Sequence, residues 1–379
     1  MSAMACASRL PKTSWIFLFL VIYSYCIFVL CTFYNRAESP AYKSDCPKLN
    51  FNMSLNCSFL PTKTVQPKPT PQDQMKLSNQ SLIIILLWTW PSGDKFPLNQ
   101  CPPSFDSSDC FLTVDRSVYS KANAVIFWHK DVSRSKSLLP QEPRPPNQYW
   151  IWFNVEPPPH VKNLTIMDNL INMTMSYRAD SDIFTPYGWL EKTEDKINFT
   201  IPQKTRLVAW VVSNWKATKR IEYYTELNKH IKVDVYGKNN LPLPRYQIRT
   251  VETLSTYKFY LAFENSVHED YITEKLWRNS FHAGTVPVVM GPPRKNYERF
   301  IPPDSFIHVD DFSSPQELAS YLLSLDKDDQ KYQQYFNWRS RYQPQKLKSS
   351  WDGRYCRVCK ALKEAPLYRT IPSIAEWFK

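Results

Sequence analysis

The chain has 379 residues, of which 43% are hydrophobic and 22% are charged, and its formal net charge is +12. This amount of apolar material excludes a disordered chain, and the length favours two domains over one. The basic excess favours an anionic partner such as a nucleotide, a phosphate or an acidic membrane, without choosing among them.

The first predicted element is a membrane span at residues 14–34, an uncharged apolar run of about the length that a bilayer requires. Arg9 and Lys12 precede it, which places the short tail, residues 1–13, in the cytosol. A cleaved signal peptide is the alternative, but its apolar part is normally about 7–15 residues long and no small-residue cleavage site follows here. We therefore expect an uncleaved signal-anchor, typical of a single-pass type II membrane protein whose remaining residues are lumenal.

Residues 35–81 are rich in polar residues and proline without an apolar period, which predicts a flexible stem. Six N-x-S/T sequons agree with a lumenal location: Asn52, Asn56, Asn79, Asn163, Asn172 and Asn198. Six cysteines beyond the anchor form an even set that suits an oxidising lumen: Cys46, Cys57, Cys101, Cys110, Cys356 and Cys359. The C-x-x-C spacing near the C-terminus lacks a second metal-ligand pair, so disulfides are favoured over zinc, with their connectivity left open.

Continuous apolar runs then predict strands that are buried on both faces of a parallel sheet, at residues 82–88, 124–128 and 149–153. Further strands are predicted at 207–212, 233–236, 259–263 and 286–290, alternating with helices at 216–231 and 273–283. Another helix begins after Ser314, which forms a capping-box pattern with Glu317. This alternation predicts doubly wound α/β structure, and the polar residues 191–205 read as a linker. We expect two α/β domains, at 82–200 and 201–379.

Charge is concentrated where the predicted strand 259–263 is followed by a helix. Thr273 can cap that helix, which places Glu274 and Lys275 in the first turn. The helix dipole and Lys275 favour a diphosphate there, and the Glu274 carboxylate could accept hydrogen bonds from a ribose. With only 6 glycines and no glycine-rich phosphate loop, such a site has to rely on cations and helix N-termini. The alternative is a solvated first turn, in which acidic residues are common anyway.

Six sequence blocks resemble the α-1,3-fucosyltransferases of glycosyltransferase family 10, over roughly residues 82–379. They are WIWFNVE at 150–156, SYRADSDI at 176–183 with PYG at 186–188, VVSNW at 211–215, FEN at 263–265, DYITEKL at 270–276 and VPVV at 286–289. The resemblance implies a GT-B-like fold of two Rossmann-type domains. It also implies an inverting transfer of L-fucose from GDP-fucose to the 3-hydroxyl of N-acetylglucosamine in N-acetyllactosamine-type glycans.

The resemblance also implies roles for individual residues. Glu156 takes the role of the catalytic base, Arg220 and Lys275 bind the phosphates, and Glu274 binds the ribose. The remaining residues near the nucleotide and sugar are Tyr187, Val211, Ser213, Asn214, Tyr260, Asn265 and Tyr271. Lys130 lies in the acceptor-specificity segment, where a basic residue is associated with type 2 chains (Galβ1,4GlcNAc). GDP-fucose is a substrate, no cofactor or defined metal site is required, and a divalent cation is expected at most to stimulate.

Three departures from the family or rival patterns bear on these expectations. Pro157 stands where the family usually has serine after the base, so a non-catalytic, membrane-anchored lumenal binding homologue is the alternative function. Two cysteines of many relatives are replaced together by Ala209 and Tyr257, as expected if they form one disulfide. The cysteines at 101, 110, 356 and 359 are kept, and in relatives they tie the ends of the catalytic region together. The pair Asp180 and Asp182 mimics the D-x-D metal motif of another glycosyltransferase fold, and we interpret it as structural.

The location implied by the resemblance, the anchor and the sequons is the Golgi membrane, with the catalytic region lumenal. An ER-resident relative that acts on protein-linked sugar is the alternative, and the lack of a K-D-E-L type ending favours the Golgi over it. Nucleic acid is not an expected partner, because no nucleic-acid-binding motif is present. A homodimer is left open.

Overall fold

The computed structural model describes residues 82–101, 105, 107–194, 198–238, 240–244, 247–345, 353–365 and 368–379. All of them belong to one compact unit, Pro69–Lys379. The predicted tail, membrane span and stem lie outside the described residues, as do the sequons Asn52, Asn56 and Asn79. Within the described ranges, no helix combines the length and apolarity that crossing a membrane requires.

The first sheet contains six parallel strands in the order β2-β1-β3-β4-β5-β6. Their bounds are Ile83–Leu87 (β1), Cys110–Thr113 (β2), Ala124–Trp128 (β3), Tyr149–Asn154 (β4), Met173–Ser176 (β5) and Ile183–Phe184 (β6). The central strands β3 and β4 are almost wholly buried, as their unbroken apolar runs predict. Trp128 lies opposite Phe153 in the register, so the carboxyl ends of these two strands lie at the same edge.

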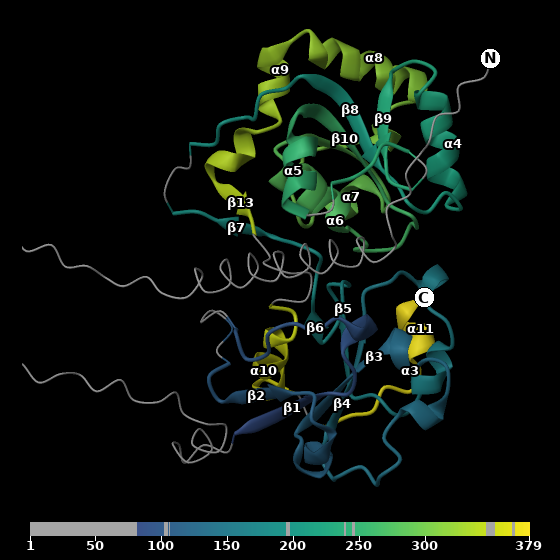
Figure 1. Cartoon of the computed structure of the whole chain (residues 1–379), viewed down its shortest axis with the longest axis vertical. Coiled ribbons are helices and arrows are strands. Elements are labelled where there is room, and N and C mark those ends of the chain that lie inside the picture. The colour runs from purple at the N-terminus through teal and green to yellow at the C-terminus, as the bar shows by residue number, and fades with distance from the viewer. Residues whose placement is uncertain are drawn as a thin grey trace, which may run out of the picture. The chain divides into compact units, whose positions relative to one another are not determined.

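The second sheet contains five parallel strands in the order β12-β11-β10-β8-β9. Their bounds are Arg206–Val211 (β8), Val233–Tyr236 (β9), Tyr257–Phe263 (β10), Val286–Met290 (β11) and Ile307–His308 (β12). Figure 1 labels three of them, β8, β9 and β10. After β8 the chain crosses to β9 at one side of the sheet, and after β10 it crosses to β11 at the other side. The crossover direction therefore reverses between β8 and β10. In open α/β sheets, ligands bind beyond the carboxyl ends of the strands at such a switch point.

Helices cover both faces of the second sheet. The bounds of the α-helices among the described residues are His129–Val132 (α3), Thr218–Leu227 (α4), Gln247–Ser255 (α5), Glu274–Leu276 (α6), Arg294–Tyr297 (α7), Pro315–Asp326 (α8), Asp329–Gln334 (α9), Cys356–Lys363 (α10) and Ile374–Phe378 (α11). Helices α4 and α8 pack on the face that carries Phe259 and Leu261. Helix α5 and the chain after α6 pack on the face that carries Tyr260. Two short strands, β7 (Leu190–Lys192) and β13 (Tyr342–Pro344), form an antiparallel ribbon beside these sheets.

Two predicted helices differ in length or type from the expectation. The helix predicted at 216–231 is shorter, because Asn228 ends α4 and its side-chain oxygen accepts a hydrogen bond from the Val233 amide at 3.1 Å. The helix predicted at 273–283 begins at the Thr273 cap, but only α6 is α-helical. It continues as a π-helix over Trp277–His282. Such wide turns are rare and are frequent at functional sites.

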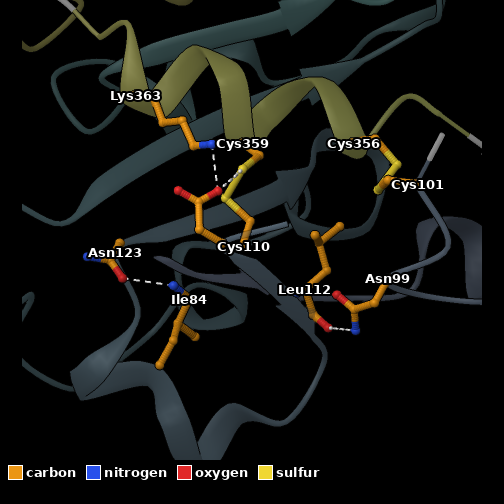
Figure 2. Close-up of a disulfide and its surroundings, with 10 residues drawn as sticks. Ile84, Asn99, Cys101, Cys110, Leu112, Asn123, Cys356, Cys359 and Lys363 are labelled. Carbon is orange, nitrogen blue, oxygen red and sulfur yellow. Dashed lines mark hydrogen bonds and ion pairs between the residues drawn. A yellow bond between two sulfur atoms is a disulfide. The ribbon is translucent and has the colours of Figure 1, made fainter. Parts of the chain in front are cut away.

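The C-terminal segment returns to the first sheet. Two disulfides, Cys101–Cys356 and Cys110–Cys359, join it to the region of β2 (Figure 2). The sequence leaves the disulfide connectivity of these four cysteines open, and the structure gives these two pairings. Cys359 and Val358 of α10 are fully buried in one core of the first sheet, and Phe378 of α11 is buried in the other.

Candidate active site

Arg220 connects the two strand ends at the switch point of the second sheet. It is the third residue of α4 and is only 4% exposed. One terminal nitrogen donates to the Phe263 carbonyl at 3.0 Å and the other to the Asn214 carbonyl at 2.7 Å. Burial lowers the pKa of its guanidinium, with Glu264 acting in the opposite direction, yet arginine titrates so high that it stays charged. A fixed cation therefore lies at the carboxyl ends of β8 and β10, at the switch point of the sheet.

The predicted residues at and just after the end of β8 differ in exposure. Val211, at the end of the strand, is half-buried, Ser213 is exposed and Asn214 is half-buried. The Asn214 side chain accepts a hydrogen bond from the Lys216 amide at 3.0 Å, which shapes the turn into α4. These three residues therefore lie at the carboxyl end of β8, beside the switch point.

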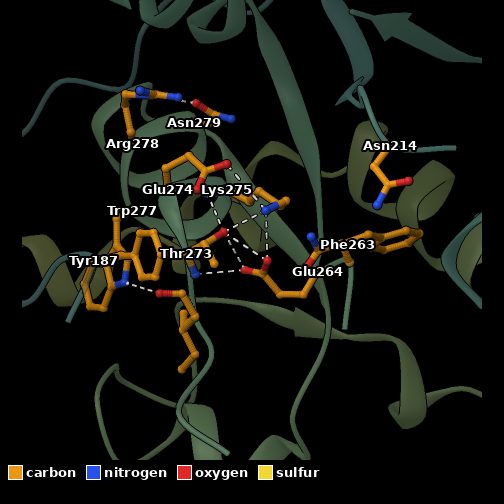
Figure 3. A network of polar contacts seen from close by, with 12 residues as sticks. Tyr187, Asn214, Phe263, Glu264, Thr273, Glu274, Lys275, Trp277, Arg278 and Asn279 are labelled. Atoms are coloured by element: carbon orange, nitrogen blue, oxygen red, sulfur yellow. Dashed lines mark hydrogen bonds and ion pairs between the residues drawn. The ribbon is translucent and has the colours of Figure 1, made fainter. Parts of the chain in front are cut away.

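Lys275 lies beyond the carboxyl end of β10, within a network of polar contacts (Figure 3). Its ammonium donates to Glu264 Oε2 at 2.9 Å, to Thr273 Oγ1 at 2.8 Å and to Glu274 Oε1 at 3.4 Å. Burial alone would lower the pKa of this ammonium, but the attraction of Glu264 and Glu274 outweighs burial and raises it. Lys275 is therefore a second fixed cation at the switch point.

The predicted ribose partner, Glu274, is more open than the lysine beside it. The exposed fractions of their side chains are 39% for Glu274 and 12% for Lys275. Burial opposes ionisation of Glu274, but Lys275 and Arg278 together lower its pKa. An ionised, accessible carboxylate at this position can accept hydrogen bonds from hydroxyl groups.

Aromatic residues line the interior side of the site. Tyr260 is fully buried, and its hydroxyl accepts a hydrogen bond from Asn279 of the π-helix at 2.9 Å, so it belongs to the core beneath Lys275. Tyr271 is 3% exposed and packs edge-on against Tyr187 with ring centroids 6.1 Å apart. The Tyr187 hydroxyl donates to the Val155 carbonyl at 2.6 Å. These two rings therefore link the second-sheet side of the site to the chain segment that follows β4.

Glu156 lies two residues beyond β4, and its side chain is 43% exposed. The Asn154 side chain holds its backbone, donating to the Glu156 carbonyl at 2.7 Å and accepting from the Glu156 amide at 3.3 Å. Pro157 stands where the family usually has serine. Its carbonyl accepts a hydrogen bond from the His160 amide at 2.8 Å, in the short helical turn that follows. The backbone position of Glu156 therefore needs no hydrogen-bond donor at residue 157.

His160 links the two sides of the site. Its Nδ1 lies 3.8 Å from Glu156 Oε2 and 3.4 Å from Asn265 Nδ2. Asn265 directly follows the buried Glu264 at the end of β10. The predicted base and the predicted donor residue Asn265 therefore both lie close to one imidazole nitrogen.

Further contacts hold the first-sheet and second-sheet sides together. The Tyr177 hydroxyl lies 2.9 Å from His268 Nδ1, and the Ala179 amide donates to Asp270 Oδ2 at 2.8 Å. Asp270 adopts a positive φ of 61°, which is uncommon for a residue other than glycine. Its backbone is held in this conformation by the partners of its buried carboxylate.

The other predicted site residues lie away from this network or at its edge. Lys130 is exposed on α3, directly after β3. Asp180 pairs with Arg178 and Asp182 with Arg369, each at 2.6 Å, so both carboxylates of the D-x-D pattern have protein partners.

The described sequons differ in accessibility. Asn163 and Asn198 are exposed, whereas Asn172 is 1% exposed and donates to the Arg369 carbonyl at 2.6 Å. A glycan on Asn172 would have to displace the C-terminal segment that carries Arg369. Occupancy of all three sequons stays a prediction.

Sequence reasoning assigned no role to Glu264, Asp270, His160 or Trp277. Glu264 directly follows a buried strand and Asp270 belongs to the DYITEKL block, whereas His160 and Trp277 lie outside both patterns, and no local pattern shows which partner each of the four meets. The contacts of Asp270 and His160 lie far away in the sequence, so only the tertiary structure brings them to the site. The ligand roles of the predicted residues stay predictions.

Two family models match the chain. "Fucosyltransferase, N-terminal" covers residues 80–188, and "Glycosyltransferase family 10 (fucosyltransferase) C-term" covers residues 201–377. Together they match more than half of the chain.

Curated relatives are similar over most of their length. A 3-galactosyl-N-acetylglucosaminide 4-alpha-L-fucosyltransferase of Pan troglodytes is 53% identical over 302 residues, which is 78% of this chain and 80% of the relative. A 4-galactosyl-N-acetylglucosaminide 3-alpha-L-fucosyltransferase of Pongo pygmaeus is 52% identical over 322 residues, or 83% and 88% of the two chains. Among solved structures, a crystal structure of an alpha1,3-fucosyltransferase with GDP-fucose is similar, with a TM-score of 0.50 and 18% identity. The likeness covers 78% of this chain and 95% of the other and supports the fold.

Proposed function

This chain belongs to glycosyltransferase family 10, the fucosyltransferases, and we propose that it moves L-fucose from GDP-fucose to the 3-hydroxyl of N-acetylglucosamine in N-acetyllactosamine-type glycans, with inversion. The observation that carries the proposal is the pair of fixed cations, Arg220 and Lys275, at the switch point of the second sheet. Glu156 connects to this site through His160 and Asn265.

The chemistry follows from the positions of these groups. Glu156 accepts the proton of the acceptor hydroxyl while that oxygen attacks the anomeric carbon of fucose. The bond from this carbon to the phosphate oxygen breaks on the opposite side, and GDP leaves with the bonding electrons. Lys275 and Arg220 stabilise the charge that develops on the diphosphate. No resident metal is required in this scheme, because side-chain cations meet that charge.

We further propose a type 2 acceptor. The order of the first sheet reverses between β1 and β3, so its own ligand crevice is expected at their carboxyl ends. Lys130 follows β3, and the Thr89 hydroxyl, which comes after β1, donates to Asp131 at 3.0 Å. The second candidate is transfer to the 4-hydroxyl in type 1 chains, because relatives of similar identity are named for each linkage.

The proposed location is the Golgi membrane, with the catalytic region lumenal. The apolar run at 14–34, the six sequons and the two disulfides support an oxidising, lumenal environment. Homodimer formation is left open.

The test is GDP release by the full chain given GDP-fucose and N-acetyllactosamine, beside a Glu156→Gln variant and a parallel assay with a type 1 acceptor. We expect the parent to turn over and the variant to lose about 10²-fold or more in kcat, since general-base catalysis typically contributes about 10²–10⁴-fold. The variant should bind GDP like the parent, because residue 156 lies on the acceptor side. A parent that binds GDP but transfers fucose to neither acceptor would favour the non-catalytic alternative.

A further inference from the structure

The Lys275 ammonium has no hydrogen-bond donor left for a ligand. It carries three N–H groups, and Glu264, Thr273 and Glu274 each accept one of them. A donor diphosphate can therefore reach this lysine only by replacing one of the three partners. Which partner leaves is determined by burial and geometry.

Glu264 is the partner that is fixed most firmly. Its side chain is 1% exposed, and it directly follows β10, the central strand of the second sheet. Besides Lys275, it accepts the Thr273 amide at 2.8 Å and the Thr273 hydroxyl at 2.9 Å. Releasing Lys275 from Glu264 would leave a buried carboxylate without its cation, which is strongly destabilising.

Glu274 is the weakest of the three partners. Its contact with Lys275 is the longest, at 3.4 Å, and its side chain is 39% exposed. In Figure 3 the ammonium lies between Glu264 on one side and Glu274 on the other. A carboxylate that is already open to solvent loses little when a phosphate oxygen takes its place, because water can solvate it.

We propose that Glu264 is a positioning residue that aims the Lys275 ammonium at the donor diphosphate, and that Glu274 is an exchangeable partner which the diphosphate displaces. This inference rests on the proposed function, since it concerns the same donor site. Displacement frees the Glu274 carboxylate to meet the ribose hydroxyls of the same ligand. Glu264 and Thr273 meanwhile keep two of the three N–H groups, so the third is held in a single direction.

A capping role alone does not account for Glu264. Thr273 already caps α6 through its own hydroxyl, which accepts the Lys275 amide. The bond from Glu264 to the Lys275 ammonium adds nothing to that cap. It supplies the buried counter-charge. Other ionisable groups that act on this pair include Glu274, Tyr260, Arg220, Tyr271 and Tyr297.

The experiment measures binding of inorganic pyrophosphate and of GDP to the full chain by calorimetry, at about pH 6.5 and about pH 8.5. The variants are Glu264→Gln, Glu264→Asp and Glu274→Gln. Glu317→Gln is the matched control, because Glu317 is a hydrogen-bonded carboxylate beside the N-terminus of α8, outside the site. Each affinity is compared with the parent at the same pH, so that titration of the probe cancels.

We expect Glu264→Gln to weaken binding of both probes, with a deficit that grows about tenfold toward the higher pH, because a buried lysine without its counter-ion loses its proton more readily. Glu264→Asp keeps the charge, so its deficit should not grow with pH. Glu274→Gln should bind pyrophosphate several-fold more tightly than the parent, because the competitor is gone, while its GDP affinity does not rise as much, because the ribose partner is lost. The control should match the parent.

Several outcomes would overturn the inference. If the parent binds GDP and Glu264→Gln shows no added loss at the higher pH, Glu264 does not hold the charge of Lys275. If Glu264→Gln does not fold, Glu274→Gln still decides, because pyrophosphate binding no tighter than in the parent would contradict the exchange. A parent that binds neither GDP nor pyrophosphate would overturn the proposed function and this inference together.

Discussion

Gly188 is a residue whose lack of a side chain is needed by the site. A Cβ atom at this position would lie 2.5 Å from the Trp277 ring. Trp277 comes two residues after Lys275, and its indole nitrogen donates to the Ile272 carbonyl at 3.1 Å, which fixes the chain before Thr273. The approach of residue 188 to the π-helix therefore helps to position the Lys275 turn.

We expect Gly188→Ala to lower the free energy of unfolding by about 1–3 kcal/mol, the usual effect of overpacking. The midpoint of thermal unfolding measures this loss. Trp277→Phe provides the matched test, because a smaller ring leaves room for the added methyl group. In the double variant the two losses should be less than additive; strict additivity would mean that residue 188 does not press on Trp277.

Helix α10 is the element that fastens the C-terminal end of the chain to the first sheet. Its two cysteines reach back 255 and 249 residues to Cys101 and Cys110. An ion pair between Lys363 and Asp109 at 2.5 Å lies beside the second disulfide. The helix is thus held by covalent, ionic and apolar contacts to the same strand region.

Removing one disulfide as a pair, with Cys110→Ser and Cys359→Ser, should cost about 2–5 kcal/mol of unfolding free energy. Its matched control is Cys101→Ser with Cys356→Ser. The 110–359 pair should cost more, because Cys359 is completely buried in the first-sheet core while Cys101 is half-buried. Urea midpoints of the two double variants measure the difference, and a larger loss for the 101–356 pair would contradict this ranking.

Two histidines couple the stability of the whole molecule to pH. Burial lowers the pKa of His129, which packs against Trp152 in the first-sheet core, and a hydrogen bond to the Lys162 carbonyl opposes this only in part. Burial, assisted by Arg178, also lowers the pKa of His268, whose ring packs on Phe378 and contacts Tyr177. Both side chains are therefore neutral in the folded protein at a pH where the unfolded chain takes up protons.

The contribution of these two histidines to stability should accordingly be constant above about pH 6.5 and should fall below it, because there each histidine binds more protons in the unfolded chain than in the folded chain. The slope is at most about 1.4 kcal/mol per pH unit for each histidine. Urea denaturation at about pH 7.5 and about pH 5.5 measures it, since the histidine model value is about 6.5. His129→Gln and His268→Gln should each flatten the slope; a slope unchanged in both variants would exclude these side chains as its source.

Much of the fold and part of the site can be predicted from sequence, because local patterns report local surroundings. The apolar runs at β3 and β4 predict burial on both faces, and the Thr273 cap places Lys275 in a first helical turn. The charge at the end of β10 predicts an anion site there, since the carboxyl edge of a parallel sheet and a helix N-terminus coincide in one short segment.

What the sequence by itself determined is therefore the central buried strands, some of the helices, the family and the side chains with the right chemistry. Only the tertiary structure decided their partners: that Cys110 bonds Cys359, that His160 joins Glu156 to Asn265, and that the helix after Lys275 widens into a π-helix. The physical reason is the sequence separation over which each kind of interaction acts. Periodicity and capping act over a few residues, whereas the pairing of a buried carboxylate, a disulfide or a close glycine contact depends on which distant segments the packed sheets bring together.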